Sequence, residues 1–169
     1  MNFRLFFLFG FALTFESCSS SSIPIHIQVS DRLVSSYIEE TKNNGLKLIG
    51  SGGSFMHDIQ AYDLHYITVQ NLDVNAARNL YVKTMETLLH RINHDPKIRP
   101  YLHTYPFTIE NVKIMSSFKK PDGKRVDSKY VALVFCVKGK IDYSRNVNNT
   151  LQDLYEEPYS EALRIVKGE

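Results

Sequence analysis

Three side chains of the kinds that bind metal ions recur at a spacing of four residues. These are Glu86, His90 and His94, and a helix would place all three on one face. Two histidines at this spacing bind zinc when a further ligand comes from elsewhere in the chain. The metalloprotease pattern His-Glu-x-x-His is missing because Arg91 follows His90, and the helix dipole alone favours histidines in a last turn. A metal-binding protein or a metal-assisted hydrolase using this trio is therefore one interpretation, and helix-end histidines without a ligand are the favoured one.

The densest group of aromatic, proline and arginine residues lies between residues 99 and 107. It includes Arg99, Tyr101, Tyr105 and Phe107. Exposed tyrosine and arginine side chains dominate interface hot spots, so this segment is where we expect an interaction patch if the chain has one. The same residues would also serve as anchors that hold a long connection against the core, a role that requires only burial. The sequence favours anchors and leaves the patch as the alternative.

Two further sets of residues resemble fragments of known sites. Residues 50–54 contain three glycines, as a phosphate-binding loop would, but lack its lysine and its following helix, so we expect a turn or a bulge. His57, Asp58, Asp63 and His65 would exchange protons with a substrate only inside a pocket. Strand alternation puts Asp63 and His65 on one face, which we expect to be the solvent face.

The two cysteines have different predicted roles. Cys136 lies within an apolar run, residues 130–137, where a thiol behaves as a small buried hydrophobe. No histidine follows it in the sequence to act as a base. We therefore predict a buried structural cysteine, no catalytic residue and no cofactor; the sequence leans away from an enzyme without deciding the question.

The first 18 residues have the pattern of an export signal. Arg4 precedes an apolar run of about eleven residues, which is too short to span a bilayer and suits a signal peptide over residues 1–17. Cys18 then stands where a lipoprotein carries its lipidated cysteine. We expect Cys18 to be a lipid anchor and residues 18–29, with four consecutive serines, to form a flexible tether. Ordinary cleavage a little later would instead release a soluble secreted factor that acts on a host.

Length and charge limit the partners of the remaining chain. Residues 30–169 are enough for one domain with its own core. The net charge is +2 and the sequence has no long basic run, so we expect no nucleic-acid partner. The predicted partners are a membrane, reached through the lipid anchor, and an envelope protein. The oligomeric state stays open.

The hydrophobic pattern predicts three helices and four to five strands. Helices are expected at residues 31–44 with Ser30 as N-cap, at 74–93 with Asp73 as N-cap, and at 159–166. Strands are expected at residues 46–49, 59–69, 112–118, 130–138 and 141–143, and a loop at 148–150. Because helices and strands do not alternate singly, we predict a single α+β domain, with a largely antiparallel sheet of four to five strands packed against a long central helix and two further helices.

Several segments also resemble a known group of proteins: residues 45–54, 80–82, 92–93, 98–103, 105–108 and 161–163. In them the mature chain resembles a family of uncharacterised exported proteins and predicted lipoproteins of chlamydia-like and related bacteria. The resemblance implies an exported protein of the cell envelope and supplies no activity and no catalytic residues. Together with the signal pattern, it predicts a lipid-anchored cell-envelope protein, facing the periplasm or the surface, with a binding or structural role.

Overall fold

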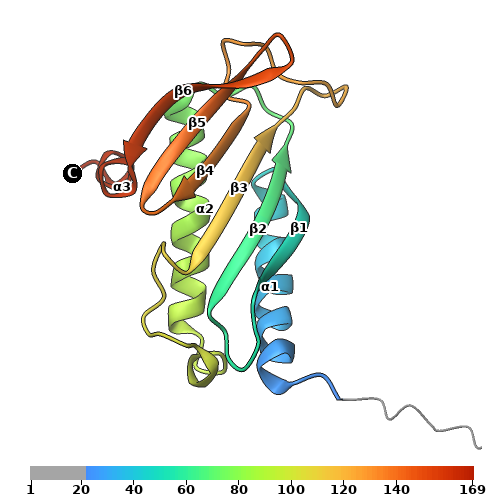
Figure 1. Ribbon diagram of the computed structural model, residues 1–169, viewed down its shortest axis with the longest axis vertical. Coiled ribbons are helices and arrows are strands. Elements are labelled where there is room, and N and C mark those ends of the chain that lie inside the picture. The colour runs from blue at the N-terminus through green and yellow to red at the C-terminus, as the bar shows by residue number, and fades with distance from the viewer. Residues whose placement is uncertain (1–21) are drawn as a thin grey trace, which may run out of the picture.

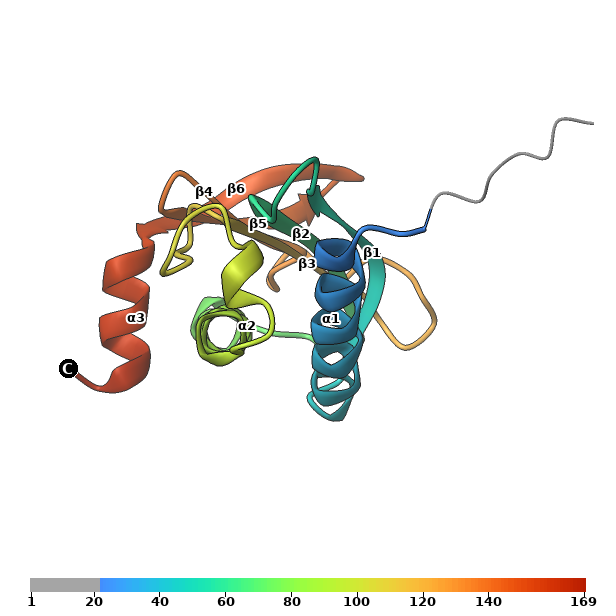
Figure 2. The same ribbon diagram turned by 90° about the horizontal axis from the view of Figure 1, so that it is seen from below.

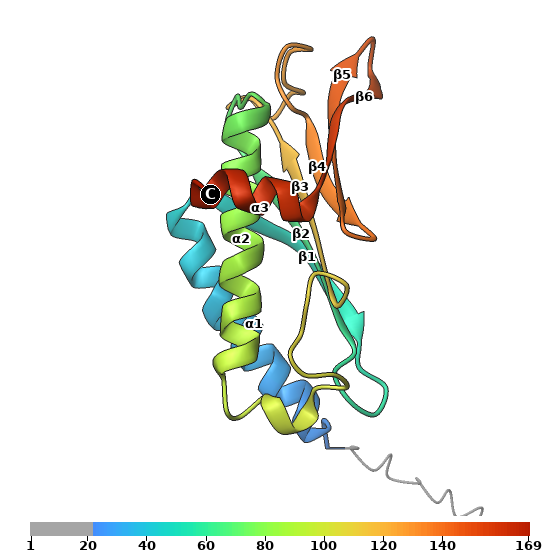
Figure 3. The ribbon, with the colours of Figure 1, turned by 90° about the vertical axis from the view of Figure 1, so that its left-hand side faces the viewer.

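One six-stranded sheet carries three α-helices on one of its faces in the computed structural model, which describes residues 22–169 (Figure 1). Figure 2 shows α2 between α1 and α3, and Figure 3 shows that no helix of the described chain covers the other face of the sheet. The elements in chain order are α1 (Ile25–Asn43), β1 (Leu46–Ser54), β2 (Ala61–Thr68), α2 (Val74–His94), the 3-10 turn η1 (Arg99–Tyr101), β3 (Val112–Phe118), β4 (Leu133–Val137), β5 (Lys140–Val147), β6 (Thr150–Pro158) and α3 (Tyr159–Lys167).

The strands lie in the sheet in the same order as in the sequence, β1 to β6. Every neighbouring pair is antiparallel except β2 and β3, which are parallel because α2 crosses over between them. The predicted α+β class and the largely antiparallel sheet are therefore confirmed. The predicted number of four to five strands is wrong, because the sheet has six.

The first helix begins six residues earlier than predicted, at Ile25. Pro24 is its N-cap, and the Pro24 carbonyl oxygen accepts hydrogen bonds from the next turn. Ser30, the predicted N-cap, instead lies inside the helix and accepts a hydrogen bond from the Tyr62 hydroxyl at 3.0 Å. Residues 25–29 of the predicted tether are thus helical, while the predicted signal peptide and Cys18 lie outside the described residues.

The helix α2 matches its prediction closely and forms the centre of the core. The Asp73 carboxylate accepts a hydrogen bond from the Ala76 backbone N–H at 2.8 Å, which satisfies one of the free donors at the helix start. Its inward face buries Tyr81, Met85, Leu88 and Ile92, so the predicted apolar stripe is confirmed.

The glycine-rich segment after residue 49 continues the first strand and does not form a turn. β1 pairs with β2 as far as Ser54, and the register shifts between Leu48 and Gly50, which is the bulge that the glycines predicted. A Cβ atom on Gly53 would lie 2.2 Å from the Ala61 carbonyl oxygen. Only glycine fits at that position.

The last strand, β6, was not predicted at all. It joins β5 through a two-residue turn, Asn148 and Asn149, whose φ angles are 49° and 64°. Asparagine tolerates this left-handed region, and two such residues in a row form the hairpin turn that suits the twist of the strands. The predicted loop at 148–150 is therefore the hairpin turn, and the predicted strand 141–143 extends over all of β5.

Candidate functional site

The predicted metal ligands do not form one group. The Glu86 carboxylate accepts a hydrogen bond from the Tyr159 hydroxyl at 2.8 Å and is thus held toward α3. His90 and His94 are exposed, their rings stack with centroids 4.0 Å apart, and His94 Nδ1 lies 2.8 Å from the His90 carbonyl oxygen. Within residues 22–169 there is no cluster of three His, Cys, Asp or Glu side chains that would hold a metal ion.

The predicted interaction patch is divided between the surface and the core. Phe107 is 2% exposed and packs edge-on against Tyr62, so it is an anchor and its place in the patch was wrong. Tyr101 is half-buried. Arg99 and Tyr105 are exposed, and the guanidinium lies over the tyrosine ring at 4.0 Å from its centroid. Only this stacked pair faces solvent.

The remaining predicted residues are placed as follows. Asp63 is exposed, and His65, on the same strand face, contacts the Ser117 hydroxyl at 3.0 Å. Asp58 pairs with His103 at 2.7 Å, a partner that the sequence did not indicate, and this hydrogen bond lowers the pKa of the Asp58 carboxyl. Cys136 is buried as predicted, and burial raises the pKa of its thiol to about 11.

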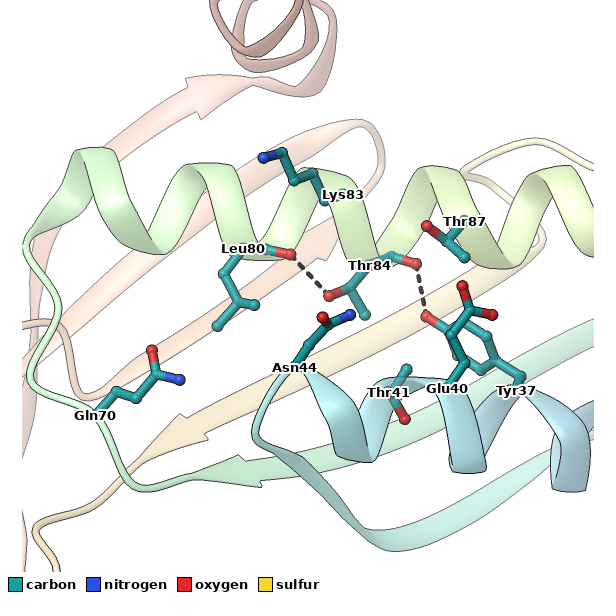
Figure 4. A pocket seen from close by; sticks show the side chains of 9 residues that line it. All are labelled: Tyr37, Glu40, Thr41, Asn44, Gln70, Leu80, Lys83, Thr84 and Thr87. Carbon is teal, nitrogen blue, oxygen red and sulfur yellow. Dashed lines mark hydrogen bonds between the residues drawn. The ribbon is translucent and has the colours of Figure 1, made fainter.

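A cleft with a largely polar lining lies between α1 and α2. Its volume is about 300 Å³, which is at the lower end for small-molecule sites. The lining comes from the end of α1, the middle of α2 and the segment that follows β2 (Figure 4); it consists of Tyr37, Glu40, Thr41, Asn44, Gln70, Leu80, Lys83, Thr84 and Thr87.

The two helices are held apart at a fixed spacing beside this cleft. The Tyr37 hydroxyl donates a hydrogen bond of 2.6 Å to the Thr84 carbonyl oxygen. One turn further along, Glu40 forms an ion pair with Arg91. These contacts tie α1 to α2 without filling the space between the polar side chains.

The lining offers hydrogen-bonding groups with little net charge. The hydroxyls of Thr41 and Thr84 donate to carbonyl oxygens of their own helices, at 2.9 and 2.7 Å, and so keep acceptor lone pairs for a guest. Asn44 and Gln70 supply amides, and Arg91 neutralises Glu40. Lys83 extends from α2 away from α1 (Figure 4).

Two buried hydroxyls next to the cleft lack a hydrogen-bond partner among residues 22–169: those of Tyr66 and Thr68. The Tyr66 ring packs edge-on against Tyr37, which lines the cleft. Burial raises the pKa of Tyr66 to about 12, although the nearby hydroxyls of Thr41 and Tyr37 act to lower it. Thr68 lies beside Gly45, as does Gln70 of the lining. Unsatisfied buried hydroxyls are rare and call for an unseen water or ligand.

The sequence analysis missed this cleft because its residues are ordinary ones. Pairs of polar residues at a spacing of three occur at the end of α1, where Thr41 is followed by Asn44 just beyond the helix, and within α2, where Thr84 is followed by Thr87. An apolar contact face would be expected at these positions. These polar pairs indicate a shared cleft only when the two helices are known to face each other. Neither histidine nor cysteine lines the cleft, and its one carboxylate, Glu40, is paired with Arg91.

Comparisons with known proteins add no relative. No protein family matches the chain, no curated protein matches it, and no solved structure matches it. None of the described helices is long and apolar enough to cross a membrane. The structure itself is thus the basis for a functional argument.

Proposed function

We propose that this protein is an exported, lipid-anchored binding protein of the cell envelope that holds a small, uncharged, hydroxyl-rich molecule between α1 and α2. The observation that carries the binding role is the polar lining of the cleft together with the two unpartnered hydroxyls of Tyr66 and Thr68 beside it. A site whose one carboxylate, Glu40, is already paired with Arg91 suits binding better than catalysis.

The class of ligand follows from the lining. Threonine hydroxyls and the amides of Asn44 and Gln70 both donate and accept, which matches the hydroxyl groups of a sugar or a polyol. A charged ligand would find no free opposite charge, because Glu40 is paired with Arg91 and Lys83 points away. A volume of about 300 Å³ accommodates one sugar ring and not a chain of several.

Calorimetric titration with a panel of neutral hexoses, N-acetylhexosamines and inositol tests this proposal. Glucuronate and glucosamine serve as charged comparators. We expect at least one neutral member to bind, and Gln70→Met to weaken its affinity about tenfold, the usual effect of one lost hydrogen bond in a binding site. The matched control is Gln152→Met, because Gln152 is exposed on β6. The proposal is contradicted if no neutral member of the panel binds at a ligand concentration of about 10 mM. It is also contradicted if Gln70→Met and Gln152→Met lose the same affinity.

The anchor is supported by the sequence alone, through the signal pattern of residues 1–17 and the position of Cys18. A domain tethered by Cys18 would hold the start of α1 nearest the membrane and the cleft, at the other end of α1, farther away. The intact mass and the N-terminal peptide of protein purified from membranes test this part. An acylated Cys18 supports the anchor, and an unmodified terminus beyond Cys18 contradicts it and favours a secreted factor.

A further inference from the structure

The face of the sheet that no described helix covers is apolar at its centre. β3 and β4 bury alternate side chains toward the helices, so that the intervening ones point to the other side. The apolar ones among these outward residues are Met115 on β3, between Lys113 and Ser117, and all three on β4, Leu133, Phe135 and Val137. Met115 is 39% and Val137 is 49% exposed. We call this set the outer apolar patch; patches of contiguous exposed apolar side chains mark interaction sites.

Beside the outer apolar patch, two opposite charges lie next to each other. Asp63 on β2 and Lys113 on β3 are paired in register. With Met115, Phe135 and Val137 they border one small hollow. Neither residue belongs to any ion pair among residues 22–169.

On the far side of this charged pair, the edge strand β1 presents glycines. Gly52 is in register with Asp63, and Gly50 with His65, so both glycines belong to the outer face. A Cβ atom on Gly52 would meet no atom within 4 Å. Nothing in the described chain therefore explains a glycine at residue 52, and glycine within a strand often marks the close approach of another backbone.

We infer that the outer face is the interface of a symmetric dimer, in which a second copy packs face to face with its two-fold axis parallel to the strands and between β2 and β3. This axis sets Asp63 of each copy opposite Lys113 of the other. It also sets β4 opposite β1 of the other copy, so that Phe135 lies over Gly50 and Val137 over Gly52. Charges and shapes are thus self-complementary, as an isologous interface requires.

The geometry of sheet packing agrees with this arrangement. Two sheets that stack face to face lie about 10 Å apart, with their strands nearly aligned. Large side chains on one sheet fill this space well when they lie opposite glycines, which have no side chain, on the other sheet. β5 and β6 lie beyond the overlap, where Lys140 already pairs with Asp142 and Glu156.

Sedimentation of the chain carrying Cys18→Ser, over a range of concentrations, tests the dimer. We expect the chain whose outer face is unaltered to form a dimer. Lys113→Asp and Asp63→Lys should each weaken the affinity of one copy for the other at least about tenfold, because each sets like charges opposite each other. The double variant Asp63→Lys with Lys113→Asp exchanges the charges and should restore the dimer. Such rescue is specific to a two-fold partner, since another protein would keep its own charges.

A second set of variants tests the apolar part. Phe135→Glu should abolish the dimer, whereas Met56→Glu, at a residue that is 79% exposed in the β1–β2 connection, should leave it intact. Circular dichroism confirms that each variant is folded. A protein that stays monomeric up to about 1 mM overturns the inference, as does a charge-exchanged double variant that dissociates as readily as the single ones.

Discussion

The replacement of Glu157 by glutamine should be among the most destabilising single changes in this fold. Glu157 is 3% exposed, and both of its oxygens accept from Arg78 Nε, at 2.8 and 3.0 Å. One oxygen also accepts from the Tyr143 hydroxyl at 2.6 Å. The hydrogen bond from Arg78 to Glu157 raises the pKa of Arg78, so the guanidinium remains charged. Glu157→Gln keeps the size of the side chain but leaves that charge buried without its counter-ion.

The expected loss is about 3–5 kcal/mol of unfolding free energy, the usual effect of removing one partner of a buried ion pair. For a domain of this size that corresponds to a decrease in Tm of roughly 6–20 °C. Chemical denaturation and thermal melts measure both quantities. The double variant Arg78→Leu with Glu157→Leu should be more stable than Glu157→Gln alone, since no unpaired charge remains.

The matched control is the surface pair of Glu161 and Arg164, which lies 2.8 Å apart with both side chains about half exposed. Glu161→Gln should leave Tm almost unchanged, because solvent screens such pairs. A Glu157→Gln variant as stable as Glu161→Gln would refute the reasoning that the Arg78 site is dry and depends on its counter-ion.

Three further predictions concern the strands and loops. Gly53→Ala should cost about 1–3 kcal/mol in chemical denaturation because its Cβ would lie 2.2 Å from the Ala61 carbonyl oxygen, whereas Gly52→Ala adds no clash within its own chain. Asp58→Asn should lower Tm at neutral pH only. The pKa of Asp58 is lowered in the folded state, so its contribution is present above the unfolded-state pKa and is lost as the pH falls through the folded-state pKa; the two melting curves should converge in acid. The thiol of Cys136 should resist labelling at pH 8 until the chain unfolds, because burial raises its pKa to about 11, and rapid labelling of the native Cys18→Ser chain would contradict this.

The elements that the sequence predicted well are those whose signal is local. α2 has a strong apolar stripe and an aspartate cap, and both are visible in consecutive residues. β6 has no such signal: most of its side chains are exposed at the sheet edge, so it lacks alternation, and only the paired asparagines before it indicated a hairpin.

The start of α1 was misplaced for a different physical reason. Its inward face contains His26 and Ser30, which hydrogen-bond to Phe55 and Tyr62 across the fold. A polar residue whose partner lies about 30 positions away is indistinguishable, in sequence, from a solvated one. Here the tertiary contact overrides the propensity that suggested a tether.

The candidate site was unpredictable for the same reason. The cleft consists of threonines and amides from two helices and a connection, and no spacing in the chain reveals that they converge. The trio of Glu86, His90 and His94 had the more recognisable pattern, yet Tyr159 holds Glu86 toward α3. Side chains that share a helix face can still point to different partners.

Backbone amide chemical shifts, recorded by NMR while a neutral sugar from the panel is titrated, test the central claim most directly. The account predicts that the shifts concentrate in residues 37–44 and 80–87 and around Gln70, the segments that line the cleft. Saturable shifts confined to another surface, or none in these segments, would contradict it.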